Sequence, residues 1–87
     1  MSPYTEEELS IFAEFGDHCA RCGQTSIVLH EIVPKSKRPK TWNTSDNRIP
    51  LCCDCHVWAH QRGTKGTINE LRYLRFNSQY RKQEERN

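Results

Sequence analysis

The chain has 87 residues, of which 34% are hydrophobic and 28% are charged. A chain of this length forms at most one domain and buries only about 60% of the surface that it exposes when unfolded, so its lean core needs another source of stability. No apolar run approaches the ~20 residues that cross a bilayer, and the first ten residues lack the pattern of a signal peptide. These features predict no membrane association and a cytoplasmic location, where thiols stay reduced.

The formal net charge of +2 hides an uneven distribution of charge along the chain. Residues 1–18 contain five acidic side chains and no Lys or Arg, whereas the rest contains thirteen basic and six acidic side chains. An excess of basic residues over most of a chain is typical of proteins with a polyanionic partner, although many solvated surfaces have a similar composition. The charge alone is therefore weak evidence for a nucleic-acid partner.

The first predicted element is a short helix over about residues 5–15. Thr5 and Glu8 have the spacing of a capping box, in which each side chain bonds the backbone N–H of the other residue. Gly16 is typical of a helix end. The apolar residues expected to face the core are Leu9, Phe12, Ala13 and Phe15.

A strand, a long loop, a second strand and a helix are predicted to follow. Residues 26–34, SIVLHEIVP, are rich in β-branched side chains and end at Pro34, which cannot donate to a strand ladder. Residues 35–47 form a basic polar loop, and residues 48–52, RIPLC, can form the second strand. The next ten residues, CDCHVWAHQR, predict a helix.

Gly63 is expected to close that helix, and the sequence GTKG predicts a linker. A second capping box, Thr67 with Glu70, predicts a final helix over about residues 67–84. The residues expected to pack this helix against the core are Leu71 and Leu74. Its basic side chains, which either contact phosphates or line an outer face, are Arg72, Arg75, Arg81 and Lys82.

Four of the five cysteines predict a structural zinc site. Cys19 with Cys22 and Cys52 with Cys55 form two C-x-x-C knuckles, and a knuckle lets one tight turn aim two thiolates at one ion. The alternatives are a redox pair and unrelated buried thiols, and a redox pair would need a larger α/β domain than this chain can form. The free energy of zinc binding would compensate for the limited stability that so small a core provides. Cys53 fits neither knuckle and is expected to be a helix-face residue rather than a ligand.

Three of the four histidines can share a second metal site. His56 and His60 are four residues apart on the predicted helix, so their side chains share a face, and His56 directly follows Cys55. A metal site built on these two histidines needs a third ligand from another element, and His30 on the first predicted strand is the suitable donor. The alternative is a pair of ordinary exposed histidines. His18 is expected to be a bystander beside the first knuckle.

The order and spacing of these residues resemble the HNH nucleases, members of the ββα-metal superfamily. Residues 15–23 are similar to the leading zinc knuckle of the family, residues 29–36, LHEIVPKS, to its first-strand motif, and residues 45–60 to its asparagine–cysteine–histidine segment. The resemblance covers roughly residues 15–62. It implies an α+β fold, a small ββα-metal (HNH) fold with a structural four-cysteine zinc site and flanking N- and C-terminal helices.

The resemblance also implies roles for individual residues. His30 and His56 match ligands of the catalytic metal, and His60 matches a third histidine that some members use. Asn47, nine residues before His56, matches the residue that braces the loop and orients the catalytic side chain. The implied reaction is hydrolysis of a phosphodiester bond with one divalent ion, which could be Mg²⁺, Mn²⁺, Ni²⁺, Co²⁺ or Zn²⁺.

The sequence departs from the family at Glu31, where most members have the histidine that activates the attacking water. A carboxylate is ordinarily ionised at neutral pH and can accept a proton from water. Three interpretations follow. Glu31 is the general base of an active nuclease, or Glu31 binds the metal while His30 activates water, or the site is catalytically reduced.

Basic side chains cluster around the predicted catalytic site. Those expected to contact DNA phosphates are Lys35, Lys37, Arg38, Lys40, Arg48 and Arg62. Such contacts give affinity with little sequence selectivity, although any one of these side chains could be merely solvated. Trp42 in the same loop either packs over the site or contacts DNA, whereas Trp58 is expected in the core.

The complete prediction is one HNH nuclease domain over residues 1–87, with a zinc-bearing ββα core over about residues 16–63. It would nick double-stranded DNA with low sequence specificity as a monomer or homodimer. Small members of the family imply a bacteriophage or mobile element, a bacterial host, and a DNA-packaging or other DNA-processing protein as partner. The alternatives are a catalytically reduced zinc module that binds DNA and an adaptor of a larger DNA-processing complex.

Overall fold

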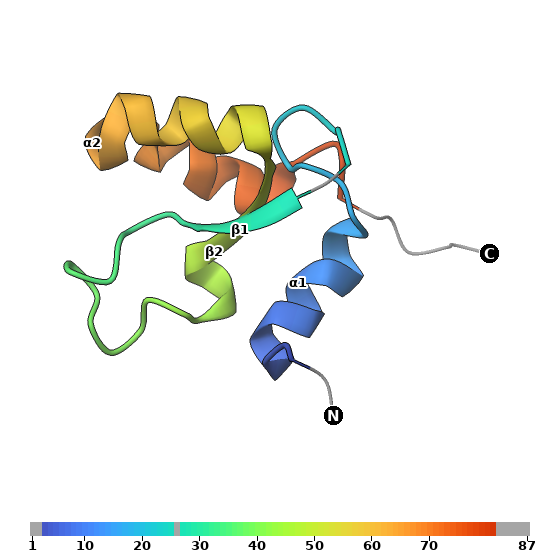
Figure 1. Cartoon of the computed structure of the whole chain (residues 1–87), viewed down its shortest axis with the longest axis horizontal. Coiled ribbons are helices and arrows are strands. Elements are labelled where there is room, and N and C mark those ends of the chain that lie inside the picture. Colours follow the sequence, from blue (N-terminus) through green and yellow to red (C-terminus); the bar gives the residue numbers. More distant parts are fainter. Residues whose placement is uncertain (1–2, 26, 82–87) are drawn as a thin grey trace.

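The computed structural model describes residues 3–25 and 27–81. Its elements are helix α1 (Glu6–Phe15), strand β1 (Ile27–Glu31), the 3₁₀ helix η1 (Ser45–Asn47), strand β2 (Arg48–Cys52) and helix α2 (Cys53–Asn77). As predicted, the fold is a small α+β arrangement in which an antiparallel hairpin leads directly into a helix (Figure 1). Within the described ranges, no helix is both long and apolar enough to span a membrane.

Helix α1 begins with the predicted capping box. The Thr5 hydroxyl accepts a hydrogen bond from the Glu8 N–H at 3.1 Å, and the Glu8 carboxylate accepts one from the Thr5 N–H at 2.9 Å. Gly16 ends the helix with a φ of 63°, a left-handed conformation that glycine adopts without strain. Both ends of α1 are therefore fixed by local interactions.

The buried face of α1 differs from the predicted one. Ile11 and Phe15, four residues apart, are fully buried, whereas Leu9 is 44% exposed and Ala13 is also exposed. Apolar residues surround more than half of this helix, so their spacing alone did not identify the side that the sheet would cover. Packing against the rest of the fold selected the pair at positions 11 and 15.

Strands β1 and β2 pair in a register that places His30 opposite Ile49 and Glu31 opposite Arg48. Adjacent residues of a strand point to opposite faces, so the side chains of His30 and Glu31 diverge. Ile49 is fully buried on the core side of β2. Strand β1 ends at Glu31, before the end predicted at Pro34, so the connection between the strands comprises residues 32–34, the predicted basic loop and, in the last three residues of that loop, η1.

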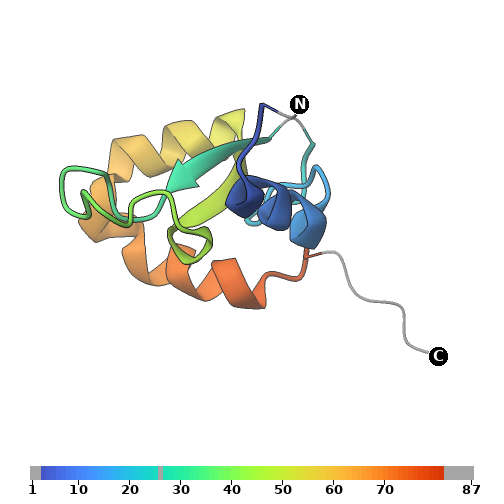
Figure 2. The same ribbon diagram turned by 90° about the horizontal axis from the view of Figure 1, so that it is seen from below.

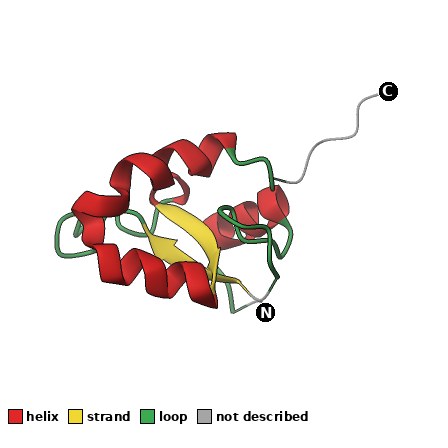
Figure 3. Cartoon of the chain, turned by 90° about the horizontal axis from the view of Figure 1, so that it is seen from above, coloured by secondary structure: helices red, strands yellow, loops and turns green. Residues whose placement is uncertain are grey.

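Helix α2 contains a kink at Gly63, where φ is 78° and ψ is 171°. The two arms of α2 diverge from this point and lie on either side of the hairpin (Figures 2 and 3). The helix resumes directly after Gly63, so the predicted four-residue linker is wrong. Thr67 does not begin a new helix, because it is buried within α2 and its hydroxyl donates to the Gly63 carbonyl at 3.0 Å. Helix α2 ends at Asn77, and the end predicted near residue 84 falls outside the described residues.

Arg75 occupies the core rather than an outer or phosphate-contacting face. Its side chain is 2% exposed, its Nε donates to the Ser45 carbonyl at 2.8 Å, and its two terminal nitrogens bond the Glu14 carboxylate. Arg81 also pairs with Glu14, while Lys82 lies outside the described residues. Burial raises the pKa of Glu14, but the two guanidinium groups outweigh burial and lower it. This ion-pair cluster joins α1, η1 and α2.

Candidate metal centres

The four knuckle cysteines converge, with all their sulfur atoms within 4.8 Å of one another. Cys19 and Cys22 come from the segment between α1 and β1, Cys52 ends β2, and Cys55 lies in the first turn of α2. The sulfurs of Cys22 and Cys52 are 3.4 Å apart, close to the roughly 3.8 Å edge of a zinc tetrahedron with ordinary Zn–S bonds. The donor set and spacing therefore fit zinc. Cys53 is exposed and outside this cluster.

Backbone N–H groups point at the sulfur atoms of the four-cysteine cluster. The N–H groups of Arg21 and Cys22 donate to Cys19 Sγ at 3.3 and 3.5 Å, and the Cys55 N–H donates to Cys52 Sγ at 3.4 Å. Burial raises the pKa of Cys19, but backbone hydrogen bonds outweigh burial and lower it to about 7. Burial prevails at Cys55 and raises its pKa to about 12. Zinc binds thiolates, so it would displace the proton of Cys55.

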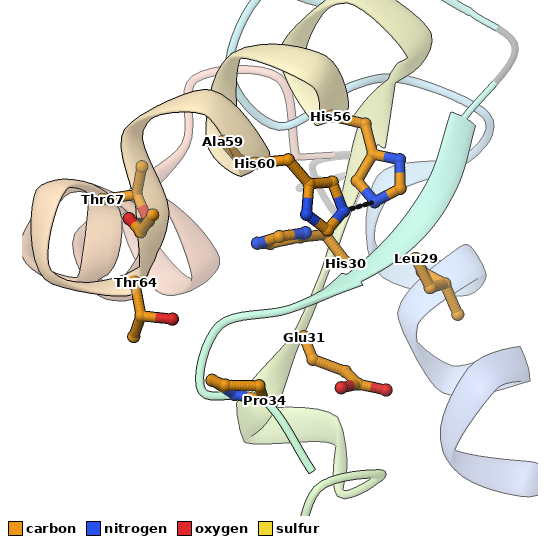
Figure 4. A pocket seen from close by; sticks show the side chains of 10 residues that line it. Leu29, His30, Glu31, Pro34, His56, Ala59, His60, Thr64 and Thr67 are labelled. Carbon is orange, nitrogen blue, oxygen red and sulfur yellow. Dashed lines mark hydrogen bonds between the residues drawn. The ribbon is translucent and has the colours of Figure 1, made fainter. Parts of the chain in front are cut away.

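The three predicted histidines form a second cluster, in which one ring nitrogen from each lies within 4.8 Å of the others. His30 on β1 faces His56 and His60 on the first arm of α2, at ring-centroid distances of 5.3 and 5.4 Å. The Nε2 atoms of His56 and His60 are 3.0 Å apart (Figure 4), near the roughly 3.3 Å separation in a tetrahedral site with ordinary Zn–N bonds. This donor set fits a divalent transition metal.

The protonation of the histidines favours metal binding. Burial, followed by the charges of His56 and His60, lowers the pKa of His30 to about 4. Burial, followed by the charge of His60, lowers the pKa of His56. His30 and His56 are therefore neutral at physiological pH, which is the form of imidazole that binds a metal.

A pocket of about 290 Å³ opens beside the histidine cluster. Glu31 and Pro34 line it from the hairpin side, and Thr64 and Thr67 line it from the second arm of α2. The Glu31 carboxylate points away from the imidazoles (Figure 4), and its Oε1 accepts a hydrogen bond from the Lys35 N–H at 3.2 Å. Glu31 thus borders the pocket without joining the histidine cluster.

Asn47 is 1% exposed and uses its whole amide group to hold the basic loop. Its Oδ1 accepts from the Val33 N–H at 2.9 Å, and its Nδ2 donates to the carbonyls of Val33 and Trp42 at 2.8 and 2.9 Å. The Asn47 carbonyl also accepts from the Ile32 N–H at 2.7 Å. Asn47 therefore ties the start of the loop, next to Glu31, to the loop's far end.

The basic residues singled out from the sequence fall into two groups. Those with exposed side chains are Lys35, Lys37, Lys40 and Arg62. Arg38 donates to the Thr41 hydroxyl at 2.8 Å and lies 3.9 Å from the Asp46 carboxylate. Arg48 is 13% exposed and pairs with Glu8 at 2.7 Å, so a phosphate contact would require Arg48 to leave this ion pair.

The remaining residues near the two clusters occupy supporting positions. His18 is exposed and lies in neither cluster, with its Nδ1 3.2 Å from the Gly23 carbonyl oxygen. Trp58 is partly buried and packs against the core. Trp42 is also partly buried, with the Lys35 ammonium 5.1 Å from its ring centroid. Arg21 was not singled out from the sequence, although its position inside a cysteine knuckle is a signal that could have identified it.

Comparison with known proteins adds one distant similarity. No family model matches the chain. A mitochondrial DNA mismatch repair protein, a mutS homolog of Sarcophyton glaucum, is 33% identical to the chain over 70 residues. The similar region makes up 68% of this chain, and the chain spans 7% of that protein's length. The similarity concerns a small part of a much longer protein, so it assigns no activity to this chain.

Proposed function

We propose that this chain is a metal-dependent DNA endonuclease of the HNH type, which nicks DNA with low sequence specificity. The observation that carries the proposal is the convergence of three imidazoles, from a strand and a helix, on one point beside a carboxylate-lined pocket. Exposed lysines of the adjacent loop suit a polyanionic substrate. The distant similarity to part of a DNA mismatch repair protein supports DNA as that polyanion.

His30, His56 and His60 would hold the catalytic ion in this scheme. A divalent ion there supplies positive charge to the transition state of phosphodiester hydrolysis. The exposed lysines of the loop hold phosphates on either side of the scissile bond. Asn47 keeps the loop and the end of β1 in a fixed relation, which positions the neighbouring carboxylate of Glu31.

Glu31 is assigned as the general base, which accepts a proton from the attacking water. The diverging directions of His30 and Glu31 favour this role over an exchange of roles, because only His30 faces the other two imidazoles. The same direction of Glu31, together with the missing family histidine, favours a catalytically reduced DNA-binding module as the second candidate. A packaging partner and a phage or mobile-element origin remain predictions from the resemblance.

Incubation with supercoiled plasmid tests the enzymatic proposal. The zinc-loaded protein, supplied in turn with Mg²⁺, Mn²⁺, Ni²⁺, Co²⁺ or additional Zn²⁺, is expected to convert the plasmid to the open-circular form with at least one ion. A gel-shift assay on the same plasmid measures binding independently. Normal DNA binding without open-circular product under any ion would reject the nuclease and favour the binding module.

Glu31→Gln is expected to slow nicking by about 10²-fold or more, within the usual range for loss of a general base. Glutamine retains an oxygen that can accept from the Lys35 N–H, so the loop and plasmid binding should be unchanged. The initial nicking rate under saturating metal is the measurement, and Glu7→Gln, at an exposed position of α1, is the control. A near-normal rate in Glu31→Gln would mean that another group activates the water.

A further inference from the structure

Arg21 lies between the two cysteines of the first knuckle and takes no part in the proposed reaction. Its Nη1 donates to Cys55 Sγ at 3.7 Å, and its Nε donates to the Glu70 carboxylate at 3.0 Å. The guanidinium group also stacks on Trp58, 3.7 Å from the ring centroid. Contacts with three partners fix the direction of this side chain, although it is 33% exposed.

The three partners of Arg21 belong to both arms of α2. Cys55 and Trp58 precede the kink at Gly63, whereas Glu70 follows it. One guanidinium group therefore connects the first cysteine knuckle to each arm. An arginine suits this position better than a lysine, because its planar group can donate from several nitrogens while its face covers an aromatic ring.

The charge of the four-cysteine cluster gives Arg21 a further role. Four thiolates carry more negative charge than one zinc ion neutralises, and hydrogen bonds to the sulfur atoms spread the excess. Arg21 supplies two such hydrogen bonds, from its backbone N–H to Cys19 and from its cationic side chain to Cys55. The second is charge-assisted, which makes it the stronger kind.

We propose that Arg21 is a positioning residue of the zinc centre, where its guanidinium offsets thiolate charge at Cys55 and strengthens zinc binding. The fit of the four cysteines to zinc underlies this inference, and the nuclease activity does not. Failure of the plasmid assay would therefore leave it standing. The consequence is a centre that holds zinc more tightly, and whose Cys55 sulfur reacts more slowly with thiol reagents, than the four cysteines alone would provide.

The test compares Arg21→Met with Glu70→Gln, using competition for zinc against a chromophoric chelator. Arg21→Met keeps apolar contact with Trp58 but removes the charge, and it should weaken zinc binding by about 10–100-fold, the usual effect of losing an outer-shell partner. Glu70→Gln removes the ion pair but leaves the Arg21 contact with Cys55, so its zinc affinity should stay close to that of the unmodified protein.

Cobalt substitution provides a readout that a purely structural role would not change. The sulfur-to-cobalt charge-transfer absorption should shift in Arg21→Met and stay in place in Glu70→Gln, because only the first variant alters the field at Cys55. If Arg21→Met does not fold with zinc, Arg21→Gln, which retains N–H donors without charge, takes its place. Unchanged zinc affinity and an unchanged cobalt spectrum in the folded Arg21 variant would overturn the proposal. So would an equal loss of affinity in Glu70→Gln.

Discussion

Replacing His56 by alanine is expected to reduce metal-dependent nicking below detection while leaving the fold intact. The ring centroid of His56 is 5.3 Å from that of His30 and 4.4 Å from that of His60, and its Nε2 is 3.0 Å from that of His60. Its removal leaves two imidazoles, which are too few to hold an ion in a fixed geometry against competition from water. Plasmid nicking, thermal unfolding of the zinc-loaded protein and a metal count per chain check this prediction.

The metal count is the more informative measurement for His56→Ala. Protein loaded with both metals should hold two ions per chain, and the variant should retain only the ion of the four-cysteine cluster. His18→Ala makes the same chemical change outside both clusters, so it should nick normally and hold two ions. Unfolding of His56→Ala would instead make His56 structural, and nicking at the normal rate would remove it from the catalytic site.

Cys52→Ser is expected to unfold the chain, whereas Cys53→Ser should leave its stability almost unchanged. Zinc binding contributes about 10–16 kcal/mol in zinc-finger peptides, comparable with the whole 5–15 kcal/mol stability of an ordinary domain. Cys52 belongs to the four-cysteine cluster, while its neighbour Cys53 is exposed and outside it. Circular dichroism and zinc content, measured at equal concentrations of protein and zinc, compare the two variants.

The substitution at position 52 separates the metal from the helix cap. Cys52 is also the N-cap of α2, and its Sγ accepts from the Cys55 N–H. Serine is a preferred N-cap residue, so Cys52→Ser retains the cap while weakening zinc binding. Addition of a strong chelator to the unmodified protein should produce the same unfolding. A Cys52→Ser protein that stays folded without zinc would show that the core suffices.

The four-cysteine cluster and the histidine cluster share one short segment of chain, which would link stability to the proposed chemistry. Cys55 and His56 are adjacent in the first arm of α2, so an ion in the four-cysteine cluster fixes the backbone that carries His56. We therefore expect zinc binding at the four-cysteine cluster to organise the start of α2 and so to position His56 for the proposed second metal site.

Local spacing in the sequence was sufficient to predict several features of the structure. The capping box of Thr5 and Glu8 and the strand over residues 48–52 formed as predicted, because each depends on residues a few positions apart. The two C-x-x-C motifs and the i, i+4 pair of histidines likewise carry their geometry within a single turn. These motifs are the parts of the candidate site that a sequence can specify directly.

Other features depended on which elements pack together, and the sequence misled there. Arginine is usually a surface residue, yet Arg75 is buried, because the Glu14 carboxylate of α1 forms an ion pair with it in the core. The ion pair of Arg48 with Glu8 across the fold could not be read from the sequence either, and the phosphate contact of Arg48 stays a prediction. Gly63 was predicted to begin a linker, whereas this one glycine, with a positive φ, is enough to turn α2 so that its two arms diverge (Figures 2 and 3).

The sequence by itself determined which side chains are candidate metal ligands: four cysteines and three histidines at spacings that suit metal binding. Only the tertiary structure decided that His30 meets His56 and His60 while Glu31 turns away. The physical reason is that successive side chains of β1 point to opposite faces of the hairpin, and the position of α2 decides which face carries the histidine cluster.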